Sequence, residues 1–419
     1  MPSAGANLPA DFRGGRLLAK LQRLLETLLR QARRLQFGLR GFQRDATRPT
    51  ALLEVTLTCQ DDLRRVFGTS GRVYLYAANG HGAWEAALCN VLSRGDKVLV
   101  CQSGLFAVGW GEMAQVLGVE VEILPGDWRR AVDPAAVEAR LKADTAGEIK
   151  AVLVVQIDTA SSVVNDIAAI RGAIDAAGHA ALYLVDTIAS LATMHFDMDA
   201  WRIDVAVAGS QKGLMTPPGL SFIAASDKAL AAHARADLVT RYWDWTFRDG
   251  EEHYMKYCGT PPEHLMFGLR RALDLLLAEG LGKVIERHRL LAGAVHAAVD
   301  TWRQGGAIDF NIEKPQERSP AVTTVLCPGG PPQALLDFCR ETCGVTLGIG
   351  IGGMSGKAFR IAHMGHVNAP MILGTLGSIE VALVALGIPH GEGGVQAAAE
   401  SLGRDLTRSE CASGRAAAV

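Results

Sequence analysis

The sequence predicts an α/β fold built on a mainly parallel sheet, with a smaller α/β domain behind it. Three observations support this prediction. The chain has 419 residues, enough for two or three domains of roughly 100–200 residues. Apolar residues make up 49% and charged residues 21%, which excludes a disordered chain, a collagen and a coiled coil. Short apolar runs alternate with segments of helical period, the pattern of a parallel sheet buried on both faces.

Short apolar runs predict the strands of the larger sheet at residues 73–76, 97–101, 119–124, 150–155, 181–185, 204–208 and 220–225. Segments of helical period lie between most of them, for example at residues 134–142 and 167–177. In sheets of this kind ligands bind beyond the carboxyl ends of the strands. The residues that follow these runs are therefore the candidates for chemistry.

The C-terminal third predicts a second α/β unit. Its expected elements are one or two long helices over 263–304, a connection over 314–320, strands at 321–326 and 358–361, and helices at 332–343 and around 373–386. We expect a large domain over residues 51–290, a small domain over 291–402 and a polar, Ala-rich tail over 403–419.

The net charge of −2 hides an asymmetry along the chain. Residues 1–50 contain ten Lys and Arg against three Asp and Glu, a charge of +7, so the other 369 residues carry −9. Leu at helical spacing with Arg between predicts an amphipathic basic helix over residues 17–40. The overall balance favours neither nucleic acid nor a membrane surface as partner, and no run reaches the ~20 apolar residues that span a bilayer.

The eight cysteines form no CxxC pair and no zinc-ligand spacing. A disulfide framework is not expected in a chain this long and this poor in cysteine. Reduced thiols in a cytoplasmic protein are the preferred interpretation.

Three short motifs could carry chemistry. Asn79-Gly80-His81-Gly82-Ala83 lies between a strand and a helical run, where backbone N–H groups at a helix N-terminus suit a phosphate, although any tight turn would also use glycine. Asp186 ends an apolar strand and is either a helix cap or a functional carboxylate.

Lys212, in Ser210-Gln211-Lys212-Gly213, follows a buried strand. Beside apolar walls it could form a Schiff base, whereas a surface turn is the plainer alternative.

Taken together, the three motifs suggest pyridoxal 5′-phosphate (PLP), which needs a phosphate cup, a carboxylate for its ring nitrogen and a lysine for its aldehyde. At this point the chain resembles the class V, fold-type I PLP-dependent aminotransferases, in particular the alanine/serine–glyoxylate group. The resemblance runs from about Leu53 to Leu402. Its motifs are GHGAWEAAL (80–88), LVDTIASL (184–191), GSQKGLMTPPG (209–219) and GKAFRIAHMG (356–365).

The resemblance implies roles for the residues of the three motifs. Lys212 would be the Schiff-base lysine and would carry the proton of the 1,3-shift. Asp186 would pair with the ring nitrogen and keep it protonated. Gly80, His81 and Gly82 would form the phosphate cup together with Gln211.

Further residues match the family around the cofactor ring. Phe106 matches the aromatic residue that stacks on the ring, where Trp is often found. Thr159 matches a hydroxyl residue near the ring oxygen. Ser162 stands where the family usually has glycine, a departure that predicts a different loop.

The resemblance also implies an obligate homodimer with shared active sites. Tyr257 and Thr260, in YCGTPP, match residues that reach the phosphate from the neighbouring subunit. Arg360 matches the arginine that clamps the α-carboxylate of the substrate, a planar anion that suits a bidentate guanidinium.

Alternatives stay open for several of these residues. His81 could only pack, and Arg360 could belong to a structural ion pair. His363 and His366 have the look of a metal pair, but no carboxylate stands at a matching spacing, so no metal is expected. The aromatic cluster of residues 242–245 could line the mouth of the active site or belong to the core.

The resemblance does not extend into residues 1–50, which lack the Gly-Pro-rich loop with which the family normally begins. An organelle transit peptide is one explanation. A replacement segment that docks on the dimer is another, and the third is an Arg-rich translation from a disrupted reading frame.

The resemblance implies a transaminase that moves an amino group from serine, alanine or aspartate to glyoxylate or a similar 2-oxo acid. An aspartate donor would need a second cation that the sequence does not identify. One alternative is a lyase or desulfurase of the same fold, which would need a catalytic cysteine on a mobile loop. The other is a non-catalytic protein that binds PLP or a partner.

Overall fold

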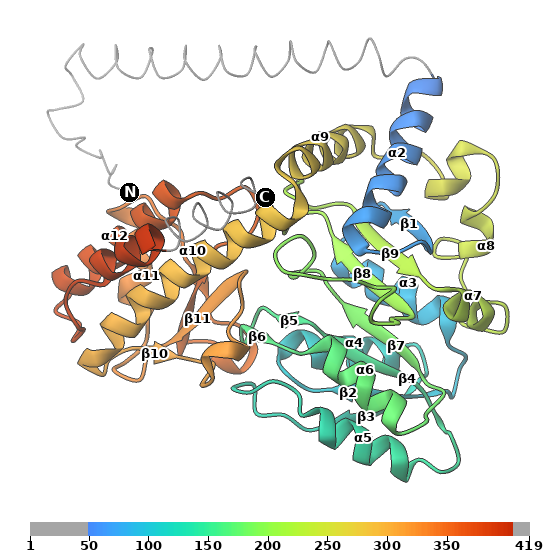
Figure 1. Ribbon diagram of the computed structural model, residues 1–419, viewed down its shortest axis with the longest axis horizontal. Helices are drawn as coiled ribbons and strands as arrows, with labels where there is room; N and C mark the ends of the chain where they lie inside the picture. Colours follow the sequence, from blue (N-terminus) through green and yellow to red (C-terminus); the bar gives the residue numbers. More distant parts are fainter. Residues whose placement is uncertain (1–48, 405–419) are drawn as a thin grey trace, which may run out of the picture. The chain divides into compact units, whose positions relative to one another are not determined.

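The computed structural model describes residues 49–404 (Figure 1). The basic helix predicted over 17–40, the interpretations of residues 1–48 and most of the predicted tail lie outside these residues. The chain divides between Thr56 and Leu57 into two units, inside helix α2 (Pro49–Phe67). Both sheets and the candidate site belong to the second unit.

A seven-stranded sheet forms the larger part of this unit, in the order β1-β9-β8-β7-β4-β2-β3. Its strands are β1 (Arg72–Tyr76), β2 (Lys97–Cys101), β3 (Glu120–Leu124), β4 (Ile149–Val155), β7 (Leu182–Asp186), β8 (Val205–Gly209) and β9 (Ser221–Ala225). Neighbouring strands from β8 to β3 are parallel, and β9 runs antiparallel to both β8 and β1. The prediction of a mainly parallel sheet, with strands at the seven apolar runs, is confirmed.

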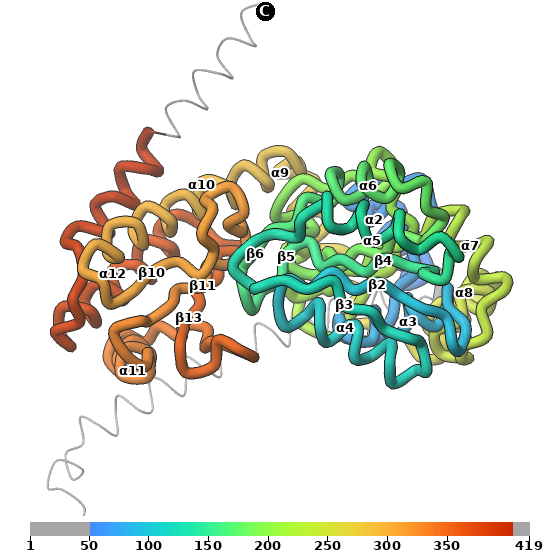
Figure 2. The backbone as a smooth tube through the Cα atoms, turned by 90° about the horizontal axis from the view of Figure 1, so that it is seen from below, coloured from blue at the N-terminus to red at the C-terminus, as the bar shows by residue number. Residues whose placement is uncertain are grey.

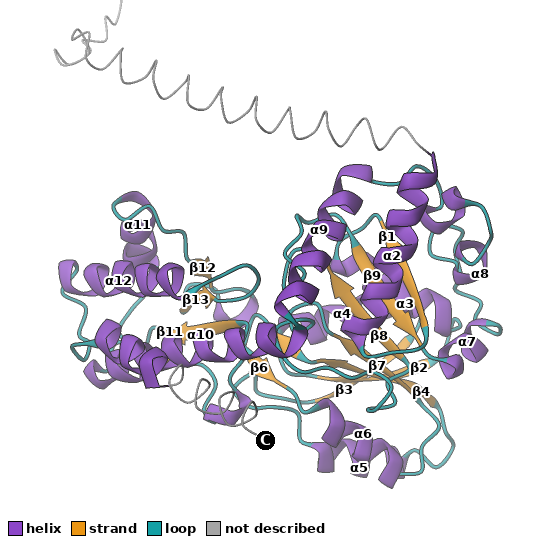
Figure 3. Cartoon of the chain, turned by 45° about the horizontal axis from the view of Figure 1, so that its top comes forward, coloured by secondary structure: helices purple, strands orange, loops and turns teal. Residues whose placement is uncertain are grey.

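Helices cover both faces of this sheet, as its apolar strands require. Helices α3 (Gly80–Val91) and α4 (Leu105–Val116) lie on one face, and α5 (Pro134–Ala143) and α6 (Ile167–Ala176) on the other (Figure 3). Every residue of β7, β8 and β9 is buried. The parallel register puts the last residue of β7, Asp186, beside Val155 of β4 and Val207 of β8, so these strand ends share one edge of the sheet.

A four-stranded antiparallel sheet carries the C-terminal part, in the order β10-β11-β13-β12. Its strands are β10 (Asp309–Phe310), β11 (Val322–Leu326), β12 (Gly348–Ile349) and β13 (Ala358–Ala362). Helices α10 (Leu281–Trp302), α11 (Gln333–Glu341) and α12 (Ala369–Ala385) gather around it (Figure 2). They share a separate apolar core that includes Trp302 and Phe359.

The long helical stretch predicted over 263–304 is two helices, α9 (Glu263–Glu279) and α10. They meet at Gly280, whose φ of +88° lies in the region that favours glycine. The remaining elements are the two-residue strands β5 (Ile157–Asp158) and β6 (Val163–Val164), the short helices α7 (Asp227–His233) and α8 (Trp245–Arg248), and 3₁₀ turns that include η2 (His253–Tyr257). The domain boundaries near residues 290 and 402 stay predictions.

Within residues 49–404, no helix is both long enough and apolar enough to cross a membrane. The cytoplasmic location expected from the cysteines stays a prediction.

A buried histidine beside the small sheet makes the free energy of unfolding depend on pH in the acidic range. His363 follows β13 and is fully buried; its Nδ1 lies 2.9 Å from the carbonyl of Pro320 and its Nε2 2.9 Å from the hydroxyl of Thr323. Burial lowers the pKa of His363 to about 4. The folded chain therefore binds this proton less readily than the unfolded chain, whose histidine titrates near 6.5.

We predict that the free energy of unfolding falls as the pH drops from about 6.5 towards 4, because protonation then favours the unfolded chain. In His363→Gln, the slope of that fall should be smaller by roughly 1.4 kcal/mol per pH unit. Urea unfolding at a series of pH values measures the free energy of unfolding and therefore this slope. His366→Gln, at a neighbouring exposed position, is the control, and equal slopes in both variants would contradict the prediction.

Candidate active site

A cavity of about 330 Å³ opens at the carboxyl ends of β4, β7 and β8. Seven of the site residues named from the sequence line it: Gly80, His81, Phe106, Thr159, Asp186, Gln211 and Lys212. The other lining residues are Asn79, Trp84, Val155, Ile157, Ile188, Ala189 and Pro218. Segments more than a hundred residues apart in the chain thus meet at the edge of the sheet where ligands were expected.

The N-terminus of α3 forms one wall of this cavity. Asn79 caps the helix, and its side-chain oxygen accepts from the Gly82 amide at 3.2 Å. The first intrahelical bond is donated by Ala83, so the amides of Gly80 and His81 precede the helical ladder. A side chain at residue 80 would meet Ile188 Cδ1 at 2.4 Å, so a larger residue here would displace the Ile188 side chain. The turn can present backbone donors to an anion.

Gly82 does not line the cavity. A Cβ at this position would come within 2.7 Å of the Ala78 Cβ and 3.2 Å of the Trp243 ring. Its lack of a side chain therefore serves the packing behind the helix terminus.

Asp186 lies at the bottom of the cavity with 3% of its surface exposed. Its Oδ2 accepts from the indole of Trp84 at 2.8 Å, and its Oδ1 accepts from the backbone N–H of Ile188 at 2.6 Å. Burial raises the pKa of Asp186 to about 7, against the opposing effect of these two hydrogen bonds. The carboxylate both fixes the turn after β7 and faces the cavity. A cation placed against it would favour its ionised form.

Lys212 projects into the same cavity from the turn after β8. Burial lowers its pKa, the nearby charge of Arg360 lowers it further, and Asp186 partly opposes both effects. The chain can pass here because residue 213 is glycine: a Cβ would lie 2.1 Å from the Leu191 carbonyl oxygen. A lysine with a lowered pKa in a partly dry cavity has the chemistry of a nucleophilic amine rather than of a solvated surface lysine.

Gln211 contributes an unusual polar group. Its side-chain oxygen is buried and has no hydrogen-bond partner among the residues that the structure describes. Buried polar atoms are rarely left unpaired, so this amide, which lines the cavity, points to a polar ligand there.

Three aromatic rings, of His81, Trp84 and Phe106, also line the cavity. The ring of Trp84 lies 4.6 Å from the ring of His81 and 6.2 Å from that of Phe106, measured between centroids. Trp84 also stacks on Trp110, at 6.0 Å with an interplanar angle of 17°. His81 thus both lines the cavity and packs on Trp84, so the two interpretations of this residue are compatible.

Arg360 lies beside the cavity, on β13 of the smaller sheet. Its Nη1 donates to the backbone oxygen of Thr159 at 2.9 Å and its Nε to that of Ile349 at 2.8 Å. Both partners are neutral, and among residues 49–404 no carboxylate lies within ion-pair distance of this guanidinium. The alternative of a structural ion pair therefore finds no support, and the charge can serve an anionic ligand.

Ser162, which stands at the family's glycine position, has a φ of +69°. This is the left-handed conformation that glycine adopts without strain. The side chain is buried, and its hydroxyl lies 2.5 Å from the hydroxyl of Thr324 on β11. The loop thus has a backbone that suits glycine, and the serine adds a contact to the smaller sheet.

Tyr257 and Thr260 do not line this cavity. Tyr257 ends η2 and is buried, with its ring 5.6 Å from that of His253. Thr260 is exposed. The predicted reach of these residues to a neighbouring subunit stays a prediction.

In the aromatic cluster of residues 242–245, Trp245 belongs to the core and Trp243 packs against it, whereas Tyr242 is exposed. Trp245 is fully buried and stacks on Tyr74 at 5.2 Å, and its indole donates to the Tyr76 hydroxyl at 3.0 Å. Trp243 donates to Glu85 at 3.2 Å. None of the cluster lines the 330 Å³ cavity. Over the described part of the chain, no three His, Cys, Asp or Glu side chains gather as metal ligands would.

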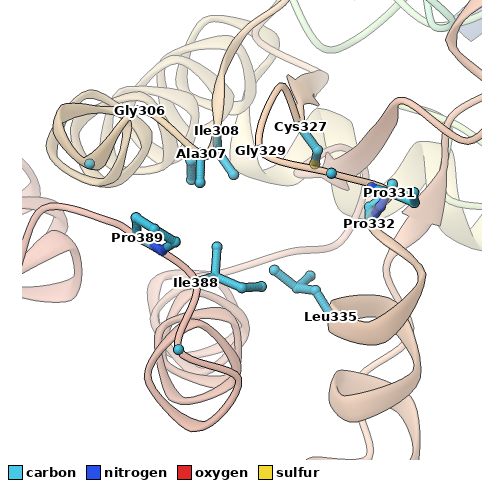
Figure 4. Close-up of a pocket in the computed structure, with 13 residues that line it drawn as sticks. Gly306, Ala307, Ile308, Cys327, Gly329, Pro331, Pro332, Leu335, Ile388 and Pro389 are labelled. Carbon is cyan, nitrogen blue, oxygen red and sulfur yellow. The ribbon is translucent and has the colours of Figure 1, made fainter.

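A cavity of about 510 Å³ in the C-terminal part has a different character (Figure 4). Proline, glycine and aliphatic residues line it, among them Ile308, Leu335 and Ile388. Its one titratable group is the Cys327 thiol, whose pKa burial raises to about 12. It has neither the nucleophile nor the carboxylate of the first cavity.

Sequence reasoning missed two polar contacts of the site. Trp84 was interpreted only as part of the apolar helical run, because nothing in its surroundings indicates a bond to Asp186. Asp158, fully buried next to Thr159, accepts from the amides of Phe106 and Ala107. It ends the two-residue strand β5, and its contacts are with a segment far away in the sequence, so no local pattern pointed to its role.

A family model for class-V aminotransferases matches residues 50–359, about three quarters of the chain. The chain belongs to the class-V aminotransferase family. The resemblance of the four motifs is thereby confirmed, together with the fold-type I architecture. Aminotransferases of this family depend in general on PLP.

The chain is similar to characterised aminotransferases over most of its length. It is 40% identical over 352 residues to serine–glyoxylate aminotransferase of Methylorubrum extorquens, covering 82% of this chain and 87% of that one. It is 38% identical over 342 residues to L-aspartate–glyoxylate aminotransferase of Paracoccus denitrificans, covering 81% and 85%. The crystal structure of ureidoglycine–glyoxylate aminotransferase from Bacillus subtilis aligns with a TM-score of 0.77 at 25% identity, covering 84% and 90%.

The two stacked tryptophans provide a matched test of the Asp186 contact. Trp84 donates to Asp186, whereas the indole nitrogen of Trp110 is buried without a partner in the described chain. We predict that Trp84→Phe raises the pKa of Asp186 above about 7, because it removes a hydrogen bond that favours the carboxylate. Trp110→Phe should leave that pKa in place.

Infrared difference spectra of the carboxyl band against pH, in the protein without added cofactor, measure this shift, with Asp186→Asn identifying the band. If both phenylalanine variants titrate as the unchanged protein does, the hydrogen bond does not set the charge state of Asp186.

Proposed function

We propose that this class-V aminotransferase binds PLP in the 330 Å³ cavity and moves an amino group from a small amino acid to glyoxylate or a similar 2-oxo acid. The observation that carries the proposal is the meeting of Lys212, Asp186 and the N-terminus of α3 around one cavity. Relatives named as serine–glyoxylate and L-aspartate–glyoxylate aminotransferases support the substrate class.

The residues of the cavity fit PLP. Gly80 and His81 offer backbone donors at a helix N-terminus, which suit the phosphate. The side-chain oxygen of Gln211, which has no hydrogen-bond partner in the described chain, lies in the same cavity and would accept from a donor there. Asp186 is a buried carboxylate with a raised pKa, which a protonated ring nitrogen would satisfy. Phe106 offers an aromatic face, and Thr159 is the hydroxyl residue expected near the ring oxygen.

When bound, PLP supplies an electron sink for the negative charge that develops on the substrate Cα. Lys212 is the base that the chain provides, and its lowered pKa allows its amine to be neutral more often near pH 7. With the cofactor bound, Lys212 would take the proton from the substrate Cα and carry it within the site. Asp186 keeps the positive charge of the ring nitrogen in place during this transfer.

Arg360 orients the substrate. Its two hydrogen bonds are to carbonyl oxygens, so its charge is available to the α-carboxylate of an amino acid or a 2-oxo acid. A guanidinium binds a planar carboxylate through two parallel hydrogen bonds. This interaction fixes the Cα position relative to the Lys212 amine.

The thiols of Cys327 and Cys339 do not favour a desulfurase. Burial raises the pKa of Cys327 to about 12 and that of Cys339 to about 11, so these thiols stay protonated near pH 7. A thiolate is the reactive form that cysteine nucleophiles use. Amino transfer therefore remains the proposed reaction.

A screen of amino donors tests the proposed function. The purified protein, loaded with PLP, is mixed with serine, alanine or aspartate, and the absorbance of the cofactor is followed. We expect at least one donor to bleach the band and glyoxylate to restore it. In Lys212→Ala the half-reaction should slow by about 10⁴-fold or more, because the base and covalent anchor are lost. A band that forms but that no donor bleaches would instead support the non-catalytic alternative.

We infer further that the active unit is a homodimer. Neither Tyr257 nor Thr260 reaches the cavity of its own chain, and Thr260 is exposed on the segment after η2. In the proposed dimer this segment completes the phosphate site of the partner.

Hybrid dimers test this arrangement. A Tyr257→Phe/Thr260→Val variant should need more PLP for half-saturation, and Lys212→Ala should be inactive. When the two variants are unfolded together and refolded, one site of each hybrid combines an intact Lys212 with an intact segment from the other subunit. We predict that activity at low PLP rises above that of the unmixed variants. Activity equal to their sum would contradict shared sites.

A further inference from the structure

Asp158 is a fully buried carboxylate directly behind the wall of the candidate site. Its Oδ2 accepts from the backbone amides of Phe106 at 2.8 Å and Ala107 at 3.1 Å. Its Oδ1 accepts from the amide of Ala160 at 3.0 Å. In each of these contacts the carboxyl oxygen is the acceptor, the pattern of an ionised carboxylate.

These contacts make Asp158 the N-cap side chain of a helix that begins more than fifty residues earlier. The residue at the N-cap position of α4 is Gly104, which has no side chain to offer. The free amides of the first turn are instead satisfied by Asp158. A negative charge at a helix N-terminus is also favoured by the helix dipole.

The close approach of the two segments requires glycine at residue 104. A Cβ there would lie 2.1 Å from the Asp158 Cγ and 2.3 Å from its Oδ1. The backbone of Gly104 is extended, so its need for glycine comes from this contact and not from backbone strain.

Two groups of the proposed site are attached to Asp158. Phe106, whose amide it binds, lines the cavity on the aromatic side. Thr159, the next residue in the chain, lines the cavity and accepts from Arg360 through its backbone oxygen at 2.9 Å. Asp158 is thus connected to Phe106, in the wall proposed to face the cofactor ring, and through Thr159 to Arg360, proposed to bind the substrate.

We propose that Asp158 is a positioning residue that holds Phe106 and Arg360 in register across the active site. This inference rests on the proposed function, because it assigns the two groups to one bound cofactor and its substrate. Removal of the carboxylate frees the first turn of α4 and the backbone at Thr159 together. Cofactor affinity and substrate affinity then fall together, although Asp158 contacts neither ligand.

Asp166 provides a matched control. It is also an aspartate N-cap, with its Oδ1 accepting from the Ala169 amide at 2.9 Å at the start of α6. Helix α6 lies on the other face of the sheet and contributes no residue to the cavity. Loss of this cap should destabilise the protein by about 1 kcal/mol, the usual cost of removing an N-cap side chain.

The test compares Asp158→Ala, Asp158→Asn and Asp166→Ala with the unchanged protein. PLP affinity is measured by quenching of tryptophan fluorescence in protein freed of cofactor. The KM of the amino donor that bleaches the PLP band gives the second readout, and the melting temperature the third. Asp158→Asn keeps the shape of the side chain, so it serves if the alanine variant does not fold. In Asp158→Asn one carboxylate oxygen becomes an NH₂ group, which cannot accept a hydrogen bond. The variant therefore loses either the bond from the Ala160 amide or the two bonds from the amides of Phe106 and Ala107.

We expect Asp158→Ala to weaken PLP binding and to raise the donor KM, each by about tenfold, because small displacements of positioning groups are costly. Asp158→Asn should show smaller changes of the same sign. Asp166→Ala should lower the melting temperature alone. If the Asp158 variants change only the melting temperature, as Asp166→Ala does, Asp158 is an ordinary cap and the inference is wrong. Failure of the unchanged protein to bind PLP would overturn the proposed function itself.

Discussion

The arrangement of the active site depends on one constraint, which is the burial of the Asp186 carboxylate at the end of a central parallel strand. An ionised carboxylate without partners in a dry interior costs several kcal/mol. The indole of Trp84 and the backbone amide of Ile188 supply two donors, and Lys212 supplies a charge of opposite sign nearby. Trp84 can reach the carboxylate only if the first turn of α3 packs tightly on the residues after β7. Gly80 allows that approach without displacing the Ile188 side chain.

The same constraint explains how charges are distributed around the cavity. Two buried carboxylates, Asp186 and Asp158, face two cations, Lys212 and Arg360. Neither cation forms a close ion pair, because no carboxylate in the described chain lies within ion-pair distance of it. They are instead kept within the electrostatic reach of the acids. A site of this kind accepts anionic ligands without first breaking a salt bridge, which suits a phosphate and a substrate carboxylate together.

Most strands of the large sheet could be predicted because they are largely buried apolar runs bounded by a helix or a turn. The edge strand β3 contains two Glu and no fully buried residue, and it was predicted from its alternating apolar positions. The two-residue strands β10 and β12 could not be predicted, since they are too short to show any period. Asp186 was found because it ends an apolar run, and Lys212 because it follows one; both belong to sequence motifs. Asp158 and Trp84 act through contacts with distant segments, and such contacts leave no local pattern. The extra loop contact of Ser162 was equally hidden, although its departure from glycine marked the position.

The loop that follows Asp158 shows why Arg360 can be held accurately by a different sheet. A left-handed φ at Ser162 costs roughly 1–3 kcal/mol for a residue other than glycine. A buried hydrogen bond such as that to Thr324 returns about 1 kcal/mol, so the strain is only partly offset by this contact. The amide of Ser319 also donates to the Ser162 carbonyl, and Asn311 donates to that of Ser161.

These bonds join the loop to the segments beside β11, the strand that pairs with Arg360 on β13. Thr324 and Arg360 are direct partners in that register. Thr324, which contacts the Ser162 hydroxyl, and Arg360 are therefore neighbours on one pair of strands, and both reach the same loop. A glycine would relieve the strain at residue 162 but would remove a tie between this loop and the strand next to the arginine. The strained serine thus exchanges some stability for a more closely defined position of the guanidinium relative to Lys212.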